Sequence, residues 1–407
     1  MIKNIQSKIK NLQIDNLRYD FDNLWIEEQE AIVARDYLLE GNSTEDHLAL
    51  YQKQLGGYLN VEPQNILLFI NAHSSLSFIL KILKDNNPEK DVVILAGFTC
   101  SVVVNAITAN QLTPVFSDIE LDTYSLNADM LEKTVNMYKG RILAVITQHL
   151  FGIVARDYEK IMNICSSHQL TTIGDCAQSL GAFYNDRTVG LLEDYAIFSS
   201  QASKSINTYT GGMLLVNNRM FEKQIIANYC KLEFPENNFV KQILTAYYMQ
   251  YRRKKFNSAL ALKLFLVHNR KKFIPSISPM EISDNRIDTL NPFPLENNQV
   301  YIYRYPDILA KIGLIQLGKI EQIISVRTGN LSLLEKSEGQ KIRIIKNSRP
   351  SLLRYPFLRT ESYKRNHHLH GNHLLGKWFP YYYGNCENAG VAARNLINYS
   401  VNIRDIK

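Results

Sequence analysis

Three side chains that can do chemistry follow one another along the middle of the chain, each at or just after a run of residues typical of a strand. Asp175 closes TTIGD, Ser199 lies at the end of YAIFSS, and Lys204 lies in the polar loop that follows. An amine can form an imine with an aldehyde, a carboxylate can keep a heterocyclic nitrogen protonated, and a hydroxyl can hold a phosphate. Pyridoxal phosphate requires this combination, so the sequence predicts a site for that cofactor.

The segment NAHSSLSF, which follows the first strand-like run, supplies the candidate phosphate cradle. Ser74 and Ser75 are predicted to open a helix there. The free N–H groups and positive dipole end of such a helix favour a dianionic phosphate. Plain N-capping by the two serines would explain the same residues without a ligand. The order of the three sites along the chain favours the interpretation as a cradle.

The elements that must position these residues alternate between β-branched runs and segments with helical periodicity. The strand-like runs are 66–70, 92–96, 114–118, 142–148, 171–175, 195–200 and 211–218, and helical patterns occupy 74–84, 101–110, 127–138 and 156–168. Alternation of this kind predicts an α/β fold with a mainly parallel, doubly wound sheet. Ligand sites in such sheets open at the carboxyl ends of the strands, where the three side chains fall.

Changes of pattern along the chain predict four parts. They are an N-terminal segment (1–45), a large cofactor-binding α/β domain (46–240), a helical basic connection (241–300) and a smaller α+β C-terminal domain (301–407). In the last part, 302–326 is predicted to be one long amphipathic helix. The runs at 342–346 and 352–358 are predicted to be strands.

Composition narrows the class of protein. With 45% hydrophobic and 21% charged residues over 407, the chain should bury a sizeable core. A net charge of +7 favours anionic partners but is too small to indicate nucleic acid. The five scattered cysteines form no C-x-x-C pair, and the histidines of HHLHGNH (367–373) have no spaced acidic partner, so we expect neither disulfides nor a metal site. Without an apolar secretion segment at its start, the chain is expected to be cytoplasmic.

Longer stretches of the chain carry a family resemblance. GFTCSVVVNAITANQLTPVFSDIELDTYSLNADMLEKTV contains a version of P-V-F-x-D-x-D-x-x-T-Y, and QHLFG resembles H-L-Y-G. The block IGDCAQSLGAFYNDRTVGLLEDYAIFSSQASKSINTYTGGMLLVNN is similar to a run from E-D-x-A-Q-x-x-G-A through (S/T)-K to G-G. Two later segments, YRYPDILAKIGLIQLGKIEQI and CENAGVAARNLINYSV, resemble a helix and the C-terminal end of the same family. These motifs resemble the DegT/StrS family of pyridoxal-phosphate-dependent nucleotide-sugar aminotransferases, which have the fold-type-I, aspartate aminotransferase-like architecture.

The resemblance implies a role for individual residues. Lys204 corresponds to the Schiff-base lysine, Asp175 to the partner of the pyridinium nitrogen, Ser199 to a phosphate ligand, and Gln178 to a residue near the ring oxygen. A lysine at position 204 counts against the dehydratase branch of the family, which resembles this block but has histidine there. The resemblance also implies a homodimer, because fold-type-I sites generally form at the subunit boundary.

Some positions depart from the family pattern. Cys100 stands where most members have an aromatic residue that stacks on the pyridoxal ring, so Phe98 or His149 could cover the ring instead. Core packing of Phe98 and a structural, hydrogen-bonded His149 are the alternative interpretations. His73 stands where the family commonly has a small residue. If protonated, it could add positive charge to the phosphate site; alternatively, it is a solvated or interface histidine. Ile302 replaces an asparagine that reaches the neighbouring subunit's phosphate.

Several functions remain open. The first is transfer of an amino group from an amino acid, expected to be glutamate, to a keto sugar, nucleotide-linked by resemblance, in polysaccharide or amino-sugar biosynthesis. The second is a non-catalytic sensor or assembly protein that binds the cofactor. It is motivated by Cys100, by Ile302, and by Asn402, which stands where the family pattern has a histidine. The third is a pyridoxal enzyme with a non-sugar keto substrate. Lys204 favours an enzyme.

Residues 247–273 place an apolar run between two basic clusters. The run is too short to span a bilayer. It could contact the surface of an anionic membrane weakly, or it could be a helix at a dimer interface with solvated basic ends. Tyr251, Arg252 and Arg253 could also line a nucleotide-diphosphate site. The sequence leaves these three interpretations open.

Overall fold

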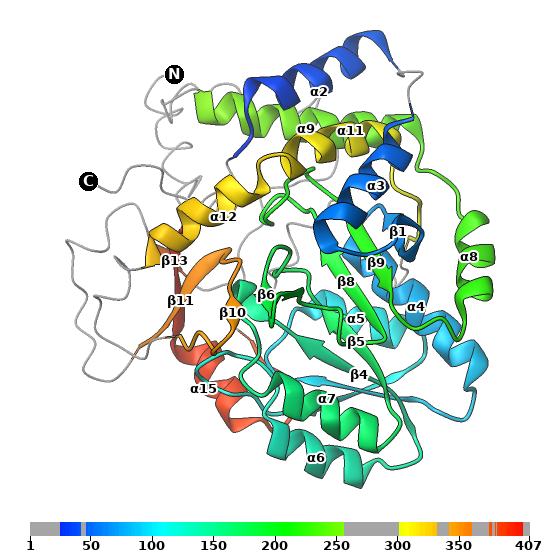
Figure 1. Ribbon diagram of the computed structural model, residues 1–407, viewed down its shortest axis with the longest axis vertical. Coiled ribbons are helices and arrows are strands. Elements are labelled where there is room, and N and C mark those ends of the chain that lie inside the picture. Colours follow the sequence, from blue (N-terminus) through cyan, green and yellow to red (C-terminus); the bar gives the residue numbers. More distant parts are fainter. Residues whose placement is uncertain are drawn as a thin grey trace, which may run out of the picture.

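A seven-stranded sheet forms the centre of the protein (Figure 1). The computed structural model describes residues 25–41, 46–255, 301–331, 342–359, 374–376, 379 and 381–401. The strand order is β1-β9-β8-β5-β4-β2-β3. The bounds are β1 Ile66–Phe69, β2 Val92–Ala96, β3 Thr113–Ser117, β4 Ile142–Gln148, β5 Thr171–Asp175, β8 Tyr195–Ser199 and β9 Gly212–Val216. Only β9 is antiparallel to its neighbours in this sheet, so the prediction of a mainly parallel sheet is confirmed.

Both faces of this sheet are buried, which explains its uninterrupted apolar strands. In β2, Val92 and Ile94 pack into one hydrophobic cluster, whereas Val93 and Leu95 pack into another on the opposite face. The second cluster includes side chains of α4 (Ala72–Asn86), α5 (Ser101–Ala109) and α8 (Glu222–Cys230). The first includes side chains of α6 (Ala128–Met137) and α7 (Tyr158–Ser167). Each predicted crossover helix is therefore present.

A layer of helices covers the β1 end of the sheet. It consists of α2 (Glu28–Glu40), α3 (His47–Leu59), α9 (Asn237–Lys255) and α11 (Asp307–Leu317), with α2 beside α9 and α11 beside α3 (Figure 1). The prediction of one helix over 302–326 was wrong, because α11 ends at Leu317 and α12 (Ile320–Gly329) begins after a break. Lys319 has non-helical dihedrals at this break, and its ammonium group binds the buried carboxylate of Glu30.

A smaller sheet follows in the C-terminal part, with the order β11-β13-β12. Its strands are β11 Arg354–Leu358, β13 Leu396–Ser400 and β12 Leu374–Gly376, and α15 (Glu387–Asn395) leads into the central strand. The strand predicted at 352–358 is confirmed. The strand predicted at 342–346 is wrong, since Arg343 N–H donates to the carbonyl of Asp122 in a loop rather than to a neighbouring strand.

Short elements complete the described structure. They are η3 (Pro63–Asn65), η4 (Leu150–Gly152), and a small sheet of β10 (Ser348–Arg349), β6 (Phe183–Tyr184) and β7 (Arg187–Thr188). The five cysteines all lie within the described residues, and no disulfide joins them. No helix within the described ranges is long and apolar enough to cross a bilayer. The four predicted parts of the chain stay a prediction, and α9 runs through residue 240.

Candidate active site

Parallel pairing brings two of the predicted residues to one edge of the sheet. β5 pairs with β8, with Asp175 opposite Ile197, so Asp175 and Ser199 end neighbouring strands. Lys204 lies in the loop between β8 and β9, where its backbone N–H donates to the carbonyl of Gln201 at 2.9 Å. All three side chains are buried, and the charges of Lys204 and Asp175 interact. The structure therefore assembles the amine and the carboxylate that the sequence singled out.

Lys204 is an unusually acidic ammonium group. Burial lowers its pKa from the ordinary 10.5 to about 8, and the positive charge of Arg354 acts in the same direction. Cys100 and Asp175 oppose this shift. Arg354 begins β11 and is itself buried, so the C-terminal sheet contributes a cation to the surroundings of Lys204. An amine that loses its proton near neutral pH can act as a nucleophile and as a base.

The carboxyl group of Asp175 has a raised pKa. Burial raises the pKa and outweighs three effects that lower it, namely a hydrogen bond from Ala177 N–H (3.1 Å) and the charges of Lys204 and His149. A cationic ring nitrogen beside this carboxylate would favour its ionised form and hold its pKa low. The protein's own groups do not supply enough positive charge for that, so the site suits a ligand that carries a protonated nitrogen. This is a fit to pyridoxal phosphate.

The loop with Lys204 is held against the start of α4. Ser199 Oγ donates to the carbonyl of Gly211 (3.4 Å) and accepts from Gln201 N–H (3.3 Å). Gly211 has a φ of +156°, which favours glycine. A Cβ on Gly212 would lie 2.2 Å from the backbone carbon of Asn71, so only glycine allows β9 to begin against the helix N-terminus. The G-G motif therefore brings Ser199 and the candidate phosphate cradle together.

The start of α4 differs from the prediction. Asn71 is the N-cap, and its Oδ1 accepts from Ser74 N–H at 2.7 Å. Ser74 Oγ lies 2.9 Å from that oxygen and 2.7 Å from the carbonyl of Tyr301, and Ser75 Oγ donates to the carbonyl of Ala72. The expectation that the two serines open the helix is therefore wrong, because the side chain of Asn71 already caps it. Phosphate binding by these serines stays a prediction.

Gln178 and His149 organise the turn after β4. Gln178 Oε1 accepts from the backbone N–H of Phe151, which has a left-handed φ of 60°. His149 is buried, with its Nδ1 accepting from Ala155 N–H at 3.1 Å. Its ring meets the ring of Tyr158 edge to face, with centroids 4.6 Å apart. A role of Gln178 near the cofactor oxygen, and of His149 over the ring, stays a prediction.

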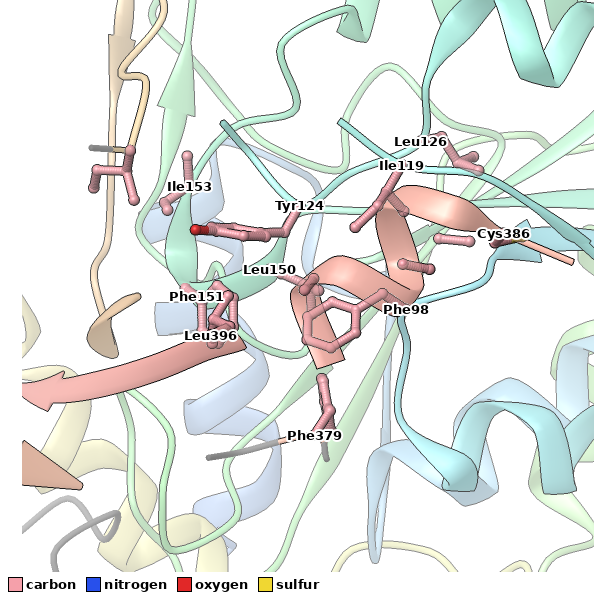
Figure 2. Close-up of a cluster of buried hydrophobic side chains, with 14 of the residues drawn as sticks. Phe98, Ile119, Tyr124, Leu126, Leu150, Phe151, Ile153, Phe379, Cys386 and Leu396 are labelled. Atoms are coloured by element: carbon pink, nitrogen blue, oxygen red, sulfur yellow. The ribbon is translucent and has the colours of Figure 1, made fainter. Parts of the chain in front are cut away.

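Phe98 is a core residue. Its side chain is fully buried and packs edge to face on Phe379 (5.5 Å between centroids), with Tyr124 nearby (Figure 2). Cys100 is the N-cap of α5 and is partly exposed, with no side-chain capping bond. The next backbone N–H, of Ser101, donates to the hydroxyl of Tyr381 at 3.2 Å. The C-terminal part thus brings an aromatic side chain to the segment where the family pattern has one.

Three residues of this region were missed by sequence reasoning: Glu193, Arg354 and Tyr381. Glu193 is buried at the end of the turn before β8, and its charge interacts with His149. A charged residue at the edge of an apolar strand was the available signal for Glu193 (LLEDYAIF) and for Arg354 (LLRYPFL). Tyr381 gave no signal, since its place depends on packing between distant segments.

Other predicted features lie elsewhere. Of residues 247–273, the structure describes those up to Lys255, where Tyr248, Tyr251 and Arg252 line a groove with Arg35 of α2. The apolar run beyond them, the 367–373 histidines and Asn402 lie outside the described residues. Within the described part, no group of three or more histidine, cysteine or acidic residues could hold a metal ion.

Comparison with curated proteins finds similar sequences, although the matches span less than half the length of these relatives. GDP-perosamine synthase of Escherichia coli O157:H7 is 32% identical over 148 residues, which is 36% of this chain and 40% of that protein. L-glutamine:2-deoxy-scyllo-inosose aminotransferase of Micromonospora echinospora is 29% identical over 134 residues, 33% of this chain and 31% of that protein.

Solved structures show the same fold over nearly the whole chain. Helicobacter pylori PseC, an aminotransferase involved in the biosynthesis of pseudoaminic acid, aligns with a TM-score of 0.65 and 16% identity over 93% of this chain and 92% of its own. Sugar aminotransferase CalS13 of Micromonospora echinospora aligns with a TM-score of 0.65 and 14% identity over 94% of both chains. The predicted fold class is confirmed. The family's sequence pattern matches residues 27–264, more than half of the 407. The chain belongs to the DegT/DnrJ/EryC1/StrS aminotransferase family.

Proposed function

We propose that the protein is a pyridoxal-phosphate-dependent aminotransferase that moves an amino group from glutamate to a nucleotide-linked keto sugar. The observation that carries this proposal is a buried amine, Lys204, with its pKa lowered to about 8 beside the buried carboxylate of Asp175. Membership of an aminotransferase family supports the reaction class. The names of relatives such as GDP-perosamine synthase support a sugar substrate.

Each residue has a distinct task in this proposal. The bound cofactor would withdraw electrons from the carbon that carries the substrate's amino group. Lys204 Nζ would hold the cofactor's aldehyde carbon and, when released, take the substrate's α-proton and return it. The carboxylate of Asp175 would keep a proton on the ring nitrogen. Ser199 Oγ and the first N–H groups of α4 would bind the phosphate.

The assembly and location are also proposals. We expect a homodimer, which is the commonest closed symmetry, acting in the cytoplasm on small molecules rather than on nucleic acid. The groove between α2 and α9, with Arg35 and Arg252 on its walls, suits either a nucleotide diphosphate or a contact between subunits. Weak membrane contact through 247–273 is the remaining alternative for this region.

Borohydride reduction followed by peptide mapping tests the central bond. The protein loaded with pyridoxal phosphate should absorb visible light, and reduction should leave a stable adduct on Lys204. Lys204→Ala should lack both the adduct and turnover, whereas Lys133→Ala, at an exposed position of α6, should keep both. An active Lys204→Ala variant, or a reduced protein without the adduct at position 204, would refute the proposal.

Half-reactions separate the remaining functions. Addition of glutamate should bleach the visible band as the amino group passes to the cofactor. Persistence of the band with every amino acid would favour the non-catalytic binding protein. If glutamate reacts, a screen of keto sugars against keto acids identifies the acceptor, and turnover with keto acids alone would refute the sugar substrate.

A further inference from the structure

The loop that carries Lys204 is closed at its base by its own backbone. The N–H of Ala202 donates to the carbonyl of Tyr209 at 3.1 Å, across the two arms of the loop between β8 and β9. The tip between these arms, residues 203–207, is buried. The place of Lys204 therefore depends on what holds this tip against the rest of the fold.

Gln316 of α11 binds the backbone of the tip. Its Oε1 accepts from the backbone N–H of Asn207 at 3.1 Å, and both residues are fully buried. Asn207 follows Lys204 by three residues. Its own Oδ1 accepts from the N–H of Tyr209 at 2.9 Å, which fastens the tip to the base of the loop. Because a buried backbone N–H that loses its acceptor is costly, this bond ties the tip to α11.

Glu30 of α2 decides which way the Gln316 amide points. The amide nitrogen Nε2 donates to Glu30 Oε1 at 2.6 Å and to the carbonyl of Trp25 at 3.0 Å. Both groups only accept hydrogen bonds, so the nitrogen must face them and the amide oxygen must face Asn207. A rotated amide would place its oxygen against a buried carboxylate. The orientation of Gln316 is thus fixed by α2.

Lys319 supports the buried carboxylate of Glu30. Its ammonium group binds Glu30 Oε1 at the break between α11 and α12, and Glu30 Oε2 accepts from the N–H of Glu27 at 3.2 Å. A buried carboxylate is tolerated when a cation and N–H donors surround it. The break that interrupts the predicted long helix therefore places the cation that keeps this acceptor beside Gln316.

A second amide reaches the same tip from α9. Gln250 Oε1 accepts from Asn207 Nδ2 at 3.3 Å. The helices α2, α9 and α11 pack together in one layer (Figure 1). This layer contacts the backbone and the side chain of Asn207 through different helices, so the loop is held by elements that belong to neither of its flanking strands.

We propose that Gln316 is a positioning residue for Lys204, which holds the tip of the lysine loop through the backbone of Asn207, with its amide oriented by Glu30. This inference rests on the proposed function, in which Lys204 binds the cofactor's aldehyde carbon. It predicts that loss of the Gln316 amide changes the reactivity of one amine and not only the stability of the fold.

Gln316→Met tests the idea because it keeps a similar volume and removes the amide. Burial is the main cause of the low pKa of Lys204, so a looser tip that admits water should raise this pKa above about 8. A rise of about one pH unit makes the free amine about tenfold scarcer at pH 7. When pyridoxal phosphate is added to the cofactor-free full chain, the visible band should grow about tenfold more slowly at pH 7, and the pH midpoint of the capture rate should rise.

Gln52→Met is the matched control. Gln52 of α3 also donates from its amide, to the carbonyl of Ile66 at 2.8 Å, and this bond lies at the start of β1. The control should lower the free energy of unfolding and leave the capture rate and its midpoint at wild-type values. A Gln316→Met protein with the wild-type capture rate and midpoint would overturn the proposal, and so would an equal shift in Gln52→Met.

Turnover gives a second readout. With the cofactor bound, Gln316→Met should lower kcat about tenfold and leave KM for the amino donor unchanged, because a displaced amine affects proton transfer more than donor binding. A rise in KM alone would contradict the positioning role.

Two measurements keep the test valid if Gln316→Met does not fold. Glu30→Gln keeps the shape but no longer forces one orientation of the Gln316 amide, so capture at pH 7 should slow in the same direction by about threefold; an unchanged rate would overturn the proposal. In the wild-type protein, the N–H of Asn207 should exchange with solvent at least about a hundredfold more slowly than in an unfolded chain. Rapid exchange there would also overturn it.

The two proposals fail in different ways. Acetylation of Lys204 by acetic anhydride at a series of pH values, followed by peptide mapping, reports on this amine without the cofactor. An acetylation midpoint that depends on Gln316, in a protein that captures no cofactor, would remove the proposed function and leave the positioning role standing. Turnover in the wild type, with a midpoint that ignores Gln316, would remove the positioning role and leave the function standing.

Discussion

Replacing Lys204 by methionine should stabilise the cofactor-free protein at neutral pH. The pKa of Lys204 is about 8 in the folded chain and is ordinarily 10.5. Between these values the unfolded chain binds more protons, so the stability of the wild-type protein rises with pH across this window. Below pH 8 the folded chain bears the full cost of a buried ammonium group. This difference in pKa corresponds to roughly 3 kcal/mol of stability. Methionine has a similar volume and no charge, so it avoids that cost.

Urea unfolding of the two proteins at intervals from pH 6 to pH 11 measures this effect. Subtracting the wild-type free energy of unfolding from that of Lys204→Met should give roughly 3 kcal/mol below pH 8, shrinking steadily as the pH rises towards 10.5. Groups that titrate alike in both proteins cancel in the subtraction. Lys133→Met, at an exposed site, should give a difference near zero throughout.

A difference between Lys204→Met and wild type that stays constant across this pH range would refute the reasoning. It would mean that burial does not perturb the amine, and the case for Lys204 as a nucleophile near neutral pH would lose its physical basis. A difference of opposite sign below pH 8 would have the same consequence.

Three further predictions concern the site and its support. Asp175→Asn should reduce turnover about a hundredfold. It should also stabilise the cofactor-free protein at pH 7, because the raised pKa of this acid makes its ionised form unfavourable in the folded chain. Turnover assays and urea unfolding measure the two effects, and unchanged turnover would contradict the assignment. Gly212→Ala should destabilise the protein by about 1–3 kcal/mol and weaken cofactor binding, since the added Cβ would meet the backbone of Asn71. The control Gly57→Ala, in open space on α3, should stabilise the protein by about 0.5–1 kcal/mol. Equal free energies of unfolding for the two variants would argue against close packing at Gly212. Asn71→Ala should cost about 1 kcal/mol as a lost N-cap, and a melting temperature equal to that of the wild type would count against it.

The large sheet was predictable because its strands are buried on both faces. Runs such as VVILA admit no amphipathic alternative, and the predicted limits of β2, β4 and β5 agree with the structure. The antiparallel direction of β9 could not be read from its composition, since a buried strand looks the same in either direction. The break between α11 and α12 was missed for a similar reason, because the apolar periodicity continues across Gly318 although the helical conformation of the backbone is interrupted there.

The candidate site was predictable only in part. Asp175, Ser199 and Lys204 stand at strand ends, where local pattern and chemistry coincide. Arg354 acts on Lys204 from another sheet, and Glu193 is buried in the core, so their places depend on burial and on contacts between residues far apart in sequence. The structure shows Asn71, rather than the two predicted serines, as the helix cap. Several nearby residues can cap a helix, and only the geometry of the fold selects one.

The order of strands in the small sheet has a consequence for synthesis of the protein. Its middle strand, β13, follows β11 and β12 in the described part of the chain and pairs with Arg354 of β11 through Ser400. A polypeptide released by the ribosome before β13 would carry Asp175, Ser199 and Lys204 but would lack the neighbour that fixes Arg354 in place. Its lysine would be more basic, so prematurely terminated copies should capture the aldehyde of the cofactor more slowly than finished ones.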